Sequence, residues 1–337
     1  MSFPKLLAIL AVVLFGTIFV AFLFKEKKES SPTVTYTPSA PLEIELDQEI
    51  AIVTPVHVPP ASYSPTIKSS ESVTNISSGE QSQPPEADRI EELFNKIDPR
   101  LPIVETIIYK SKVAWQQGRP AWLSDYANHY RTSRHFIARS LNGKPDYLKQ
   151  DIAEGARFNV FRSDKNFNFH LVIDLSRCKM WFYYYDEGSN ERVLLKTYAV
   201  GLGRVESSKA SGLLTPLGTY ILGDKIAIYK PKMMGPYNGE KIEMIKVFGT
   251  RWIPFETEVG ECTAPAKGFG IHGNPWHLTE AGQLVEDTTS IGKYQSDGCI
   301  RLTTADVEEL FAVMITRPTT VYLVKDFYDA KLPGIEK

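Results

Sequence analysis

The chain has 337 residues with a formal net charge of -2, and 43% of its residues are hydrophobic. This length and composition allow one or two domains with packed cores. Because the charge is nearly balanced, there is no global basic field, and nucleic acid is not expected as a partner.

An uncharged apolar segment runs from Leu6 to Phe24, after a short flank at residues 1–5. It is about as long as a helix that crosses a bilayer. The charged stretch KEKKES follows it in place of a small-residue cleavage site, so we expect an uncleaved single-pass transmembrane helix at 6–24 in the cell membrane. Lysines are more frequent after the span than before it, which by the positive-inside rule favours a cytoplasmic body. The orientation therefore stays open at this stage.

Residues 25–86 are rich in proline, serine and threonine. Such a segment buries too little apolar surface to offset its ordering entropy, so we predict an extended linker. Within it, LEIELDQEIAIV at 42–53 alternates in polarity and fits either a short strand or a docking peptide.

Helical periodicity begins at Ala87 and predicts a small helical module over 87–160. Helices are expected over 87–97, 101–118 and 124–143, and the last of these ends at an Asn-Gly pair. His129 and His135 are interpreted as surface or packing residues, because their spacing does not place them on one helix face.

From about residue 165 to 327 the pattern changes to a mainly β domain with one late helix. Residues 169–188 are rich in aromatic and β-branched side chains and end at a turn signal, after which 192–203 is the expected partner strand. The late helix, 303–315, begins with Thr303 as its cap. Further strands are predicted over 215–222, 267–273 and 319–327.

The segment SIGKYQSDGCIRL, from Ser290 to Leu302, contains one of only three cysteines, Cys299. The chain has no CxxC motif, and no histidine pair at zinc-ligand spacing lies near Cys299 in the sequence, so neither a metal nor an organic cofactor is expected. One interpretation is that Cys299 is a buried apolar residue and His272 a hydrogen-bonded core histidine. The other is a thiolate nucleophile, which needs a base and donors for the oxyanion it creates. His272 lies between two glycines at a strand end and is the best candidate base, Gly298 allows a sharp bend beside the nucleophile, and Arg301 would share a face with Cys299 in an extended segment.

Three segments together, TPLGTY at 215–220, GFGIHG at 268–273 and SIGKYQSDGCIRL, resemble the signature segments of L,D-transpeptidase catalytic domains, the YkuD-like family. The resemblance extends over about residues 168–325 and implies a β-sandwich-like fold. It also implies that Cys299 is the acylated nucleophile, that His272 deprotonates it, and that the backbone at Gly298 and Cys299 stabilises the oxyanion. Arg301 and Ser296 match the remaining positions of the motif, and Gly273 follows the histidine. All three are expected at the substrate.

The sequence departs from the family at Asp297, where a histidine is usual. A carboxylate beside the nucleophile should raise the pKa of the thiol. Asp297 could pair with Arg301 or Lys293, orient His272, or be a turn residue that faces solvent.

A second departure is the insertion HLTEAGQLVED at 277–287, which we expect to form a loop or short helix over the cleft. His277 in it could supply the missing imidazole or be an ordinary loop histidine. Trp276 and Tyr237 could shape a peptide groove or simply pack. Cys262 could line the site, pack, or form a disulfide with Cys299, whereas Cys178 is expected in the core.

The resemblance implies an enzyme that forms 3→3 cross-links between peptidoglycan stem peptides through a cysteine thioester, with a tetrapeptide as donor and an amine as acceptor. Peptidoglycan lies outside the cytoplasmic membrane, so the body would have to be extracytoplasmic in spite of the flanking lysines. Two alternatives remain open. One is a carboxypeptidase or amidase that passes the same thioester to water, and the other is an inactive wall-binding module.

Overall fold

The computed structural model describes residues 83–97, 100–224 and 226–337 of the chain. The expected span at 6–24 and most of the expected linker at 25–86 lie outside these residues. Within the described part, no helix is both long and apolar enough to cross a membrane.

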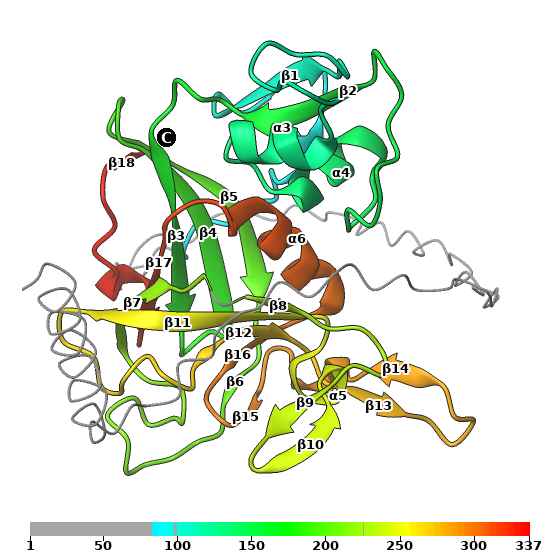
Figure 1. Cartoon of the computed structure of the whole chain (residues 1–337). Coiled ribbons are helices and arrows are strands. Elements are labelled where there is room, and N and C mark those ends of the chain that lie inside the picture. Colours follow the sequence, from blue (N-terminus) through cyan, green and yellow to red (C-terminus); the bar gives the residue numbers. More distant parts are fainter. Residues whose placement is uncertain (1–82, 98–99, 225) are drawn as a thin grey trace, which may run out of the picture. The chain divides into compact units, whose positions relative to one another are not determined.

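A ten-stranded mixed sheet forms the centre of the described fold, with the strand order β16-β12-β11-β7-β17-β3-β4-β5-β18 and β8 paired to β11. The strands are β3 (Phe167–Asp174), β4 (Lys179–Asp186), β5 (Glu191–Ala199), β7 (Gly218–Leu222), β8 (Ala227–Ile228), β11 (Arg251–Val259), β12 (Gly270–Gly273), β16 (Ile300–Leu302), β17 (Thr319–Val324) and β18 (Ile335–Glu336). In Figure 1, β3, β4 and β5 run steeply across the direction of β11, so the sheet curls on itself. Helix α6 (Thr304–Met314) packs against β11, β12 and β16. The expected mainly β, sandwich-like fold is confirmed.

Residues 169–188 contain most of β3 and all of β4, which form an antiparallel hairpin with a turn at 175–178. Nearly every side chain of both strands is buried, so the sequence shows an apolar run without alternation. One face, which includes Leu171 and Phe182, packs into the main core. The other, which includes Trp181 and Tyr183, packs under Phe327 near the C-terminus.

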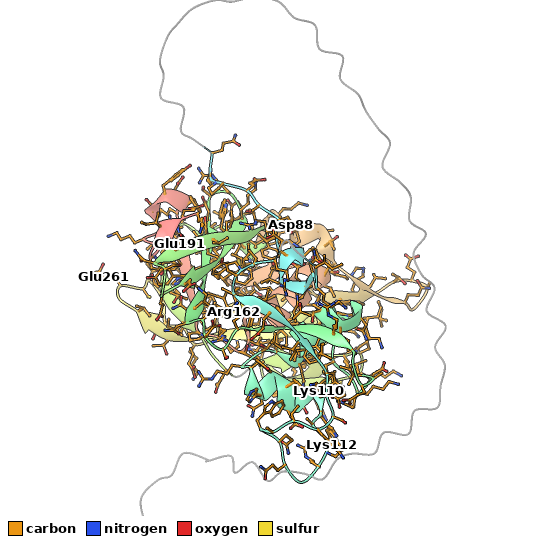
Figure 2. All side chains as sticks on the ribbon, turned by 90° about the horizontal axis from the view of Figure 1, so that it is seen from above. Asp88, Lys110, Lys112, Arg162, Glu191 and Glu261 are labelled. Carbon is orange, nitrogen blue, oxygen red and sulfur yellow. The ribbon has the colours of Figure 1, made fainter. Side chains whose placement is uncertain are left out.

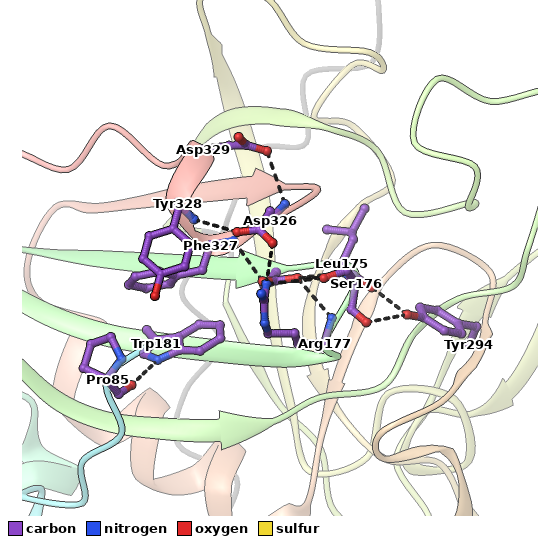
Figure 3. Close-up of polar contacts among 11 residues, drawn as sticks. Pro85, Leu175, Ser176, Arg177, Trp181, Tyr294, Asp326, Phe327, Tyr328 and Asp329 are labelled. Carbon is purple, nitrogen blue, oxygen red and sulfur yellow. Dashed lines mark hydrogen bonds and ion pairs between the residues drawn. The ribbon is translucent and has the colours of Figure 1, made fainter. Parts of the chain in front are cut away.

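Polar contacts fix the β3–β4 turn to two other parts of the chain (Figure 3). Arg177 in the turn is paired with the buried carboxylate of Asp174 and lies 2.8 Å from the carboxylate of Asp326. The hydroxyl of Tyr294 donates to the carbonyl of Leu175 at 2.8 Å. Because Tyr294 lies five residues before Cys299, this contact anchors the segment that leads to the cysteine.

The module expected to be helical over 87–160 also contains a two-stranded antiparallel sheet, β1 (Val104–Ile108) with β2 (Arg157–Phe161). The helix predicted over 101–118 is wrong, since β1 occupies its first half. The helix predicted over 124–143 is interrupted at residues 130–133. The helices of this region are α2 (Glu91–Phe94), α3 (Leu123–His129) and α4 (Arg134–Asn142).

A buried charge network joins α4 to the large sheet. Asp146 follows α4 and accepts from Arg251 of β11 at 2.5 Å, and it lies 3.1 Å from Nδ1 of His135. Arg251 is fully buried and reaches Glu308 of α6 at 3.4 Å. Because an unpaired buried charge is costly, these contacts hold the module against the β domain.

Short elements surround the edge formed by β12 and β16, where the hairpins β9–β10 and β13–β14 lie on either side of α5 in Figure 1. These elements are β6 (Leu202–Gly203), β9 (Met234–Tyr237), β10 (Glu240–Glu243), α5 (Ile245–Phe248), β13 (Trp276–Leu278), β14 (Leu284–Glu286), the 3-10 turns at Thr288–Ser290 and Phe327–Asp329, and β15 (Tyr294–Ser296). The insertion at 277–287 therefore forms most of a β-hairpin, and the expected loop or short helix is wrong.

Candidate active site

Parallel pairing of β12 with β16 brings the two predicted signature segments together. His272 lies opposite Arg301, and Ile271 lies opposite Ile300. Side chains alternate along a strand, so Cys299, just before β16, is on the same face as Arg301 and His272. The register therefore gathers the thiol, the imidazole and the guanidinium on one face of the sheet edge.

His272 is buried and held in one tautomer. Its Nδ1 lies 2.7 Å from the carbonyl of Gly273, which can only accept, so Nδ1 carries the proton and Nε2 has the free lone pair. Burial lowers the pKa of His272 to about 4, and the positive charge of Arg301 acts in the same direction. The hydrogen bond to Gly273 acts to raise the pKa but is outweighed. The imidazole is therefore neutral at pH 7 and ready to accept a proton at Nε2.

Aromatic rings form one wall beside His272. Phe248, the last residue of α5, meets the imidazole edge-on at 5.3 Å between centroids, and Trp252 lies at 6.0 Å. Tyr237 packs edge-on against Phe248 at 5.6 Å. Tyr237 thus reaches the site through the aromatic wall, which fixes the orientation of the histidine.

Cys299 is partly exposed, and its Sγ lies 3.7 Å from the carbonyl oxygen of Gly268. Desolvation raises the pKa of the thiol to about 11. The N–H of Gly270 and the charge of Arg301 act in the opposite direction, whereas Asp297 raises the pKa further. The resting pair at neutral pH is accordingly a thiol beside a neutral imidazole.

A tight turn before Cys299 is fixed by hydrogen bonds. The Oγ of Ser296 donates to the carbonyl of Cys299 at 2.6 Å and accepts from the N–H of Gly298 at 3.1 Å. Gly298 has φ 120°, and a Cβ there would lie 2.6 Å from a ring carbon of Phe269. Buried Thr215 donates to the carbonyl of Gly298 at 2.9 Å. Ser296, predicted at the substrate, is thus buried in the turn, and the N–H of Gly298 is already engaged.

Asp297 points outward and pairs with Arg204 at 2.6 Å, with both side chains more than half exposed. The predicted partners Arg301 and Lys293 do not form this ion pair. Because Arg204 is 93 residues away in sequence, no local pattern indicated the contact. The arginine places a compensating positive charge beside the carboxylate at the mouth of the site.

Arg301 is the charged group of the site that has no counterion. Among the residues the structure describes, no carboxylate lies within ion-pair distance of its guanidinium, and its buried Nε has no hydrogen-bond partner. Arginine binds carboxylates in a bidentate manner, so this side chain is suited to a substrate carboxylate.

The remaining predicted residues lie around this centre. Gly273 is buried and supplies the carbonyl that orients His272. Trp276 is partly buried at the start of β13, and His277, the next residue, is exposed on that hairpin. All three cysteines are free in the structure, and Cys262 donates from Sγ to the carbonyl of Thr219 at 3.2 Å.

Four residues that shape the site were not among those predicted: Thr215, Arg204, Phe248 and Trp252. Thr215 stands in the TPLG string, so its position in a signature segment was a usable signal. The other three had none, because only tertiary pairing brings them to Cys299 or His272.

Residues 168–323 match the YkuD family, described as the L,D-transpeptidase catalytic domain. The matched segment is just under half of the chain, and the match concerns the catalytic domain alone. No curated protein matches the chain.

Among solved structures, Bd1075 of Bdellovibrio bacteriovorus is 12% identical over 47% of this chain and 48% of that chain, with a TM-score of 0.32. The helical cell shape determining protein Pgp2 of Campylobacter jejuni is 17% identical over 50% of this chain and 51% of that chain, with a TM-score of 0.32. L,D-transpeptidase 1 of Mycobacterium tuberculosis is 16% identical over 50% of this chain and 70% of that chain, with a TM-score of 0.22. The chain spans about half the length of the first two.

Proposed function

We propose that this protein is a peptidoglycan L,D-transpeptidase that forms 3→3 cross-links through a thioester on Cys299. The observation that carries the proposal is the parallel register of β12 and β16, which puts Cys299, His272 and the unpaired Arg301 on one face. The family match over residues 168–323 supports the reaction class.

In the first half-reaction, Nε2 of His272 accepts the proton of Cys299 as Sγ attacks the carbonyl of the third stem residue. Of the two backbone N–H groups predicted to stabilise the oxyanion, that of Gly298 is hydrogen-bonded to Ser296. The N–H of Cys299 is therefore the proposed oxyanion donor. Collapse of the tetrahedral intermediate breaks the peptide bond, and the imidazolium returns its proton to the departing D-alanine amine.

In the second half-reaction, an acceptor amine attacks the thioester carbonyl and gives a proton to His272. Expulsion of the thiolate completes the new amide bond, and the histidine reprotonates the sulfur. The low pKa of His272 keeps it unprotonated at the start of each half-reaction. Arg301 would hold a carboxylate of the stem peptide near the scissile bond.

Hydrolysis of the same thioester would make the protein a carboxypeptidase or amidase, and an inactive wall-binding module is the third possibility. The Arg204–Asp297 ion pair argues against the inactive module, because it offsets the negative charge that would suppress the thiolate. The proposed location is the outer side of the cell membrane, with the segment at 6–24 as the anchor.

The test is the intact mass of the protein after incubation with a tetrapeptide stem or a carbapenem. We expect a covalent adduct on the wild type and on Cys262→Ala, a matched control at the second partly exposed thiol, and none on Cys299→Ala. An adduct that persists in Cys299→Ala, or none on the wild type up to a pH near the thiol pKa, contradicts the proposal. Addition of an acceptor stem then distinguishes transfer from hydrolysis. Transfer, the expected reaction, gives a cross-linked dimer, whereas hydrolysis releases a tripeptide.

A further inference from the structure

Two clefts lie at the junction of the small module with the β domain, apart from the residues around Cys299. The first has a volume of about 620 Å³ and lies between the α3–α4 connection, β8 and the C-terminal half of α6. The second, of about 390 Å³, lies beside the segment 163–166. Arg131 lines both clefts, so they adjoin at this residue.

The junction carries three arginines without counterions. Arg131 and Arg134 are exposed on the first cleft, and Arg317 lines the second together with Arg131. Within the described ranges, no carboxylate lies within ion-pair distance of any of the three. The nearby Asp164 lines the second cleft but is already paired with Arg162 at 2.6 Å.

Arg317 is held in place by aromatic rings, with its guanidinium carbon 4.4 Å from the centroid of Phe167 and 5.5 Å from that of Phe161. Burial lowers the pKa of Arg317, and the neighbouring charge of Arg131 lowers it further. The two guanidinium groups line the same cleft, and the carboxylate beside them, Asp164, is already paired with Arg162. An anion placed in that cleft would offset the positive charges of Arg131 and Arg317.

The backbone at Arg131 adds a separate observation. Its φ is 46°, in the left-handed region where glycine or asparagine fits with less strain. An arginine at this position therefore carries a conformational cost that asparagine or glycine would carry less of.

The floor of the first cleft is apolar and includes Ile226, Ile228, Phe311 and Ile315. A bare inorganic anion would leave this surface uncovered. A peptide with free carboxylates matches both halves of the cleft, and the volume is in the usual range for ligand sites.

We infer that this junction is a second substrate site, in which Arg131, Arg134 and Arg317 bind the carboxylates of a peptidoglycan stem peptide while its aliphatic part packs on the isoleucine floor. The choice of ligand rests on the proposed function. The site would give the small module a role, since α4 and the segment before it supply two of the arginines. The stem peptide bound there would belong to a peptidoglycan strand other than the one that reacts at Cys299.

The test is a titration of the full chain with a soluble disaccharide tetrapeptide. The chain carries Cys299→Ala to prevent turnover, and binding is monitored through the NMR signals of labelled isoleucine methyl groups. Ile226, Ile228 and Ile315 report on the cleft, whereas Ile271 and Ile300 lie beside the nucleophile. We expect both sets of signals to shift, with separate affinities. If only the second set shifts, or neither does, the inference is wrong, while the adduct experiment still decides the proposed function.

The variant is Arg131→Asn with Arg134→Gln, which removes two charges from exposed positions and suits the left-handed backbone at residue 131. We expect it to weaken binding at the cleft signals about tenfold or more, as for loss of charge-assisted hydrogen bonds. The control is Lys110→Gln with Lys112→Gln, two exposed lysines of the same module that do not line the clefts (Figure 2). Equal weakening by both double variants would mean that net charge alone drives binding, which also overturns the inference.

Discussion

The charges of Asp297 and Arg204 are expected to act in opposite directions on the pKa, and so on the reactivity, of the Cys299 thiol. Asparagine at 297 removes a negative charge near the sulfur and lowers the pKa of the thiol, whereas glutamine at 204 removes a positive charge and raises it. Across the tight turn, the Cα atoms of Asp297 and Cys299 are two residues apart and so at most about 7 Å apart, which sets the scale of the charge separation. In water, unit charges at that distance interact by about 0.6 kcal/mol, or about 0.4 of a pKa unit. The solvent value applies because Asp297 is more than two-thirds exposed.

Since the pKa of Cys299 is about 11, only a small thiolate fraction is present near pH 8, and each change in pKa alters this fraction directly. We expect the alkylation rate of Cys299 to rise about two- to threefold in Asp297→Asn and to fall by a smaller factor in Arg204→Gln, because the guanidinium contacts the exposed carboxylate rather than the thiol. The assay is the iodoacetamide rate against pH in a Cys262→Ala background, which removes the other partly exposed thiol.

The matched controls are Asp164→Asn and Arg162→Gln, because that exposed pair has the same 2.6 Å separation and Asp164 lines the second junction cleft rather than the site of Cys299 (Figure 2 labels Arg162). They should leave the rate unchanged. If Asp297→Asn and Arg204→Gln shift the pKa of Cys299 in the same direction, residues 297 and 204 do not act on the thiol through their charges.

Three further predictions concern the support of the site. Gly298→Ala should abolish acylation, because its Cβ would lie 2.6 Å from the Phe269 ring at a strained φ; an active variant with an unchanged melting temperature would contradict this. Thr215→Val should reduce acylation and cost about 1–3 kcal/mol through the unsatisfied Gly203 N–H, and Thr215→Ser should restore most of both. Although burial acts to raise it, hydrogen bonds and charge from His135 and Arg251 lower the pKa of Asp146 to about 2. The carboxylate therefore contributes about 2 kcal/mol above its unfolded pKa near 4, and Asp146→Asn should lose this in urea unfolding at pH 7, with the difference shrinking as the pH falls toward 2.

The signature segments were readable because each is short and keeps its chemistry in adjacent residues. Cys299, Gly298 and Arg301 occur within four positions, and His272 stands between two glycines in a strand. The late helix was also predicted correctly, including Thr303 as its cap, because helix periodicity and capping are local properties.

The small module was interpreted incorrectly because its decisive contacts are not local. The segment VETII of β1 is too short to separate helical from strand periodicity, and its partner β2 begins about fifty residues later. In isolation either structure is marginal, so burial of Phe158 and Val160 in the module's own core decides the outcome.

The sequence by itself indicated the candidate thiol, its candidate base and the similarity to the family, since these depend on residue type and on spacing within single strands. Only the tertiary structure decided what surrounds them: Arg204 beside Asp297, the aromatic wall at His272, the engaged N–H of Gly298, and the arginines of the junction. These contacts join residues far apart in the chain, and their energies depend on distance and burial, which exist only after the sheet has curled and the module has packed against it.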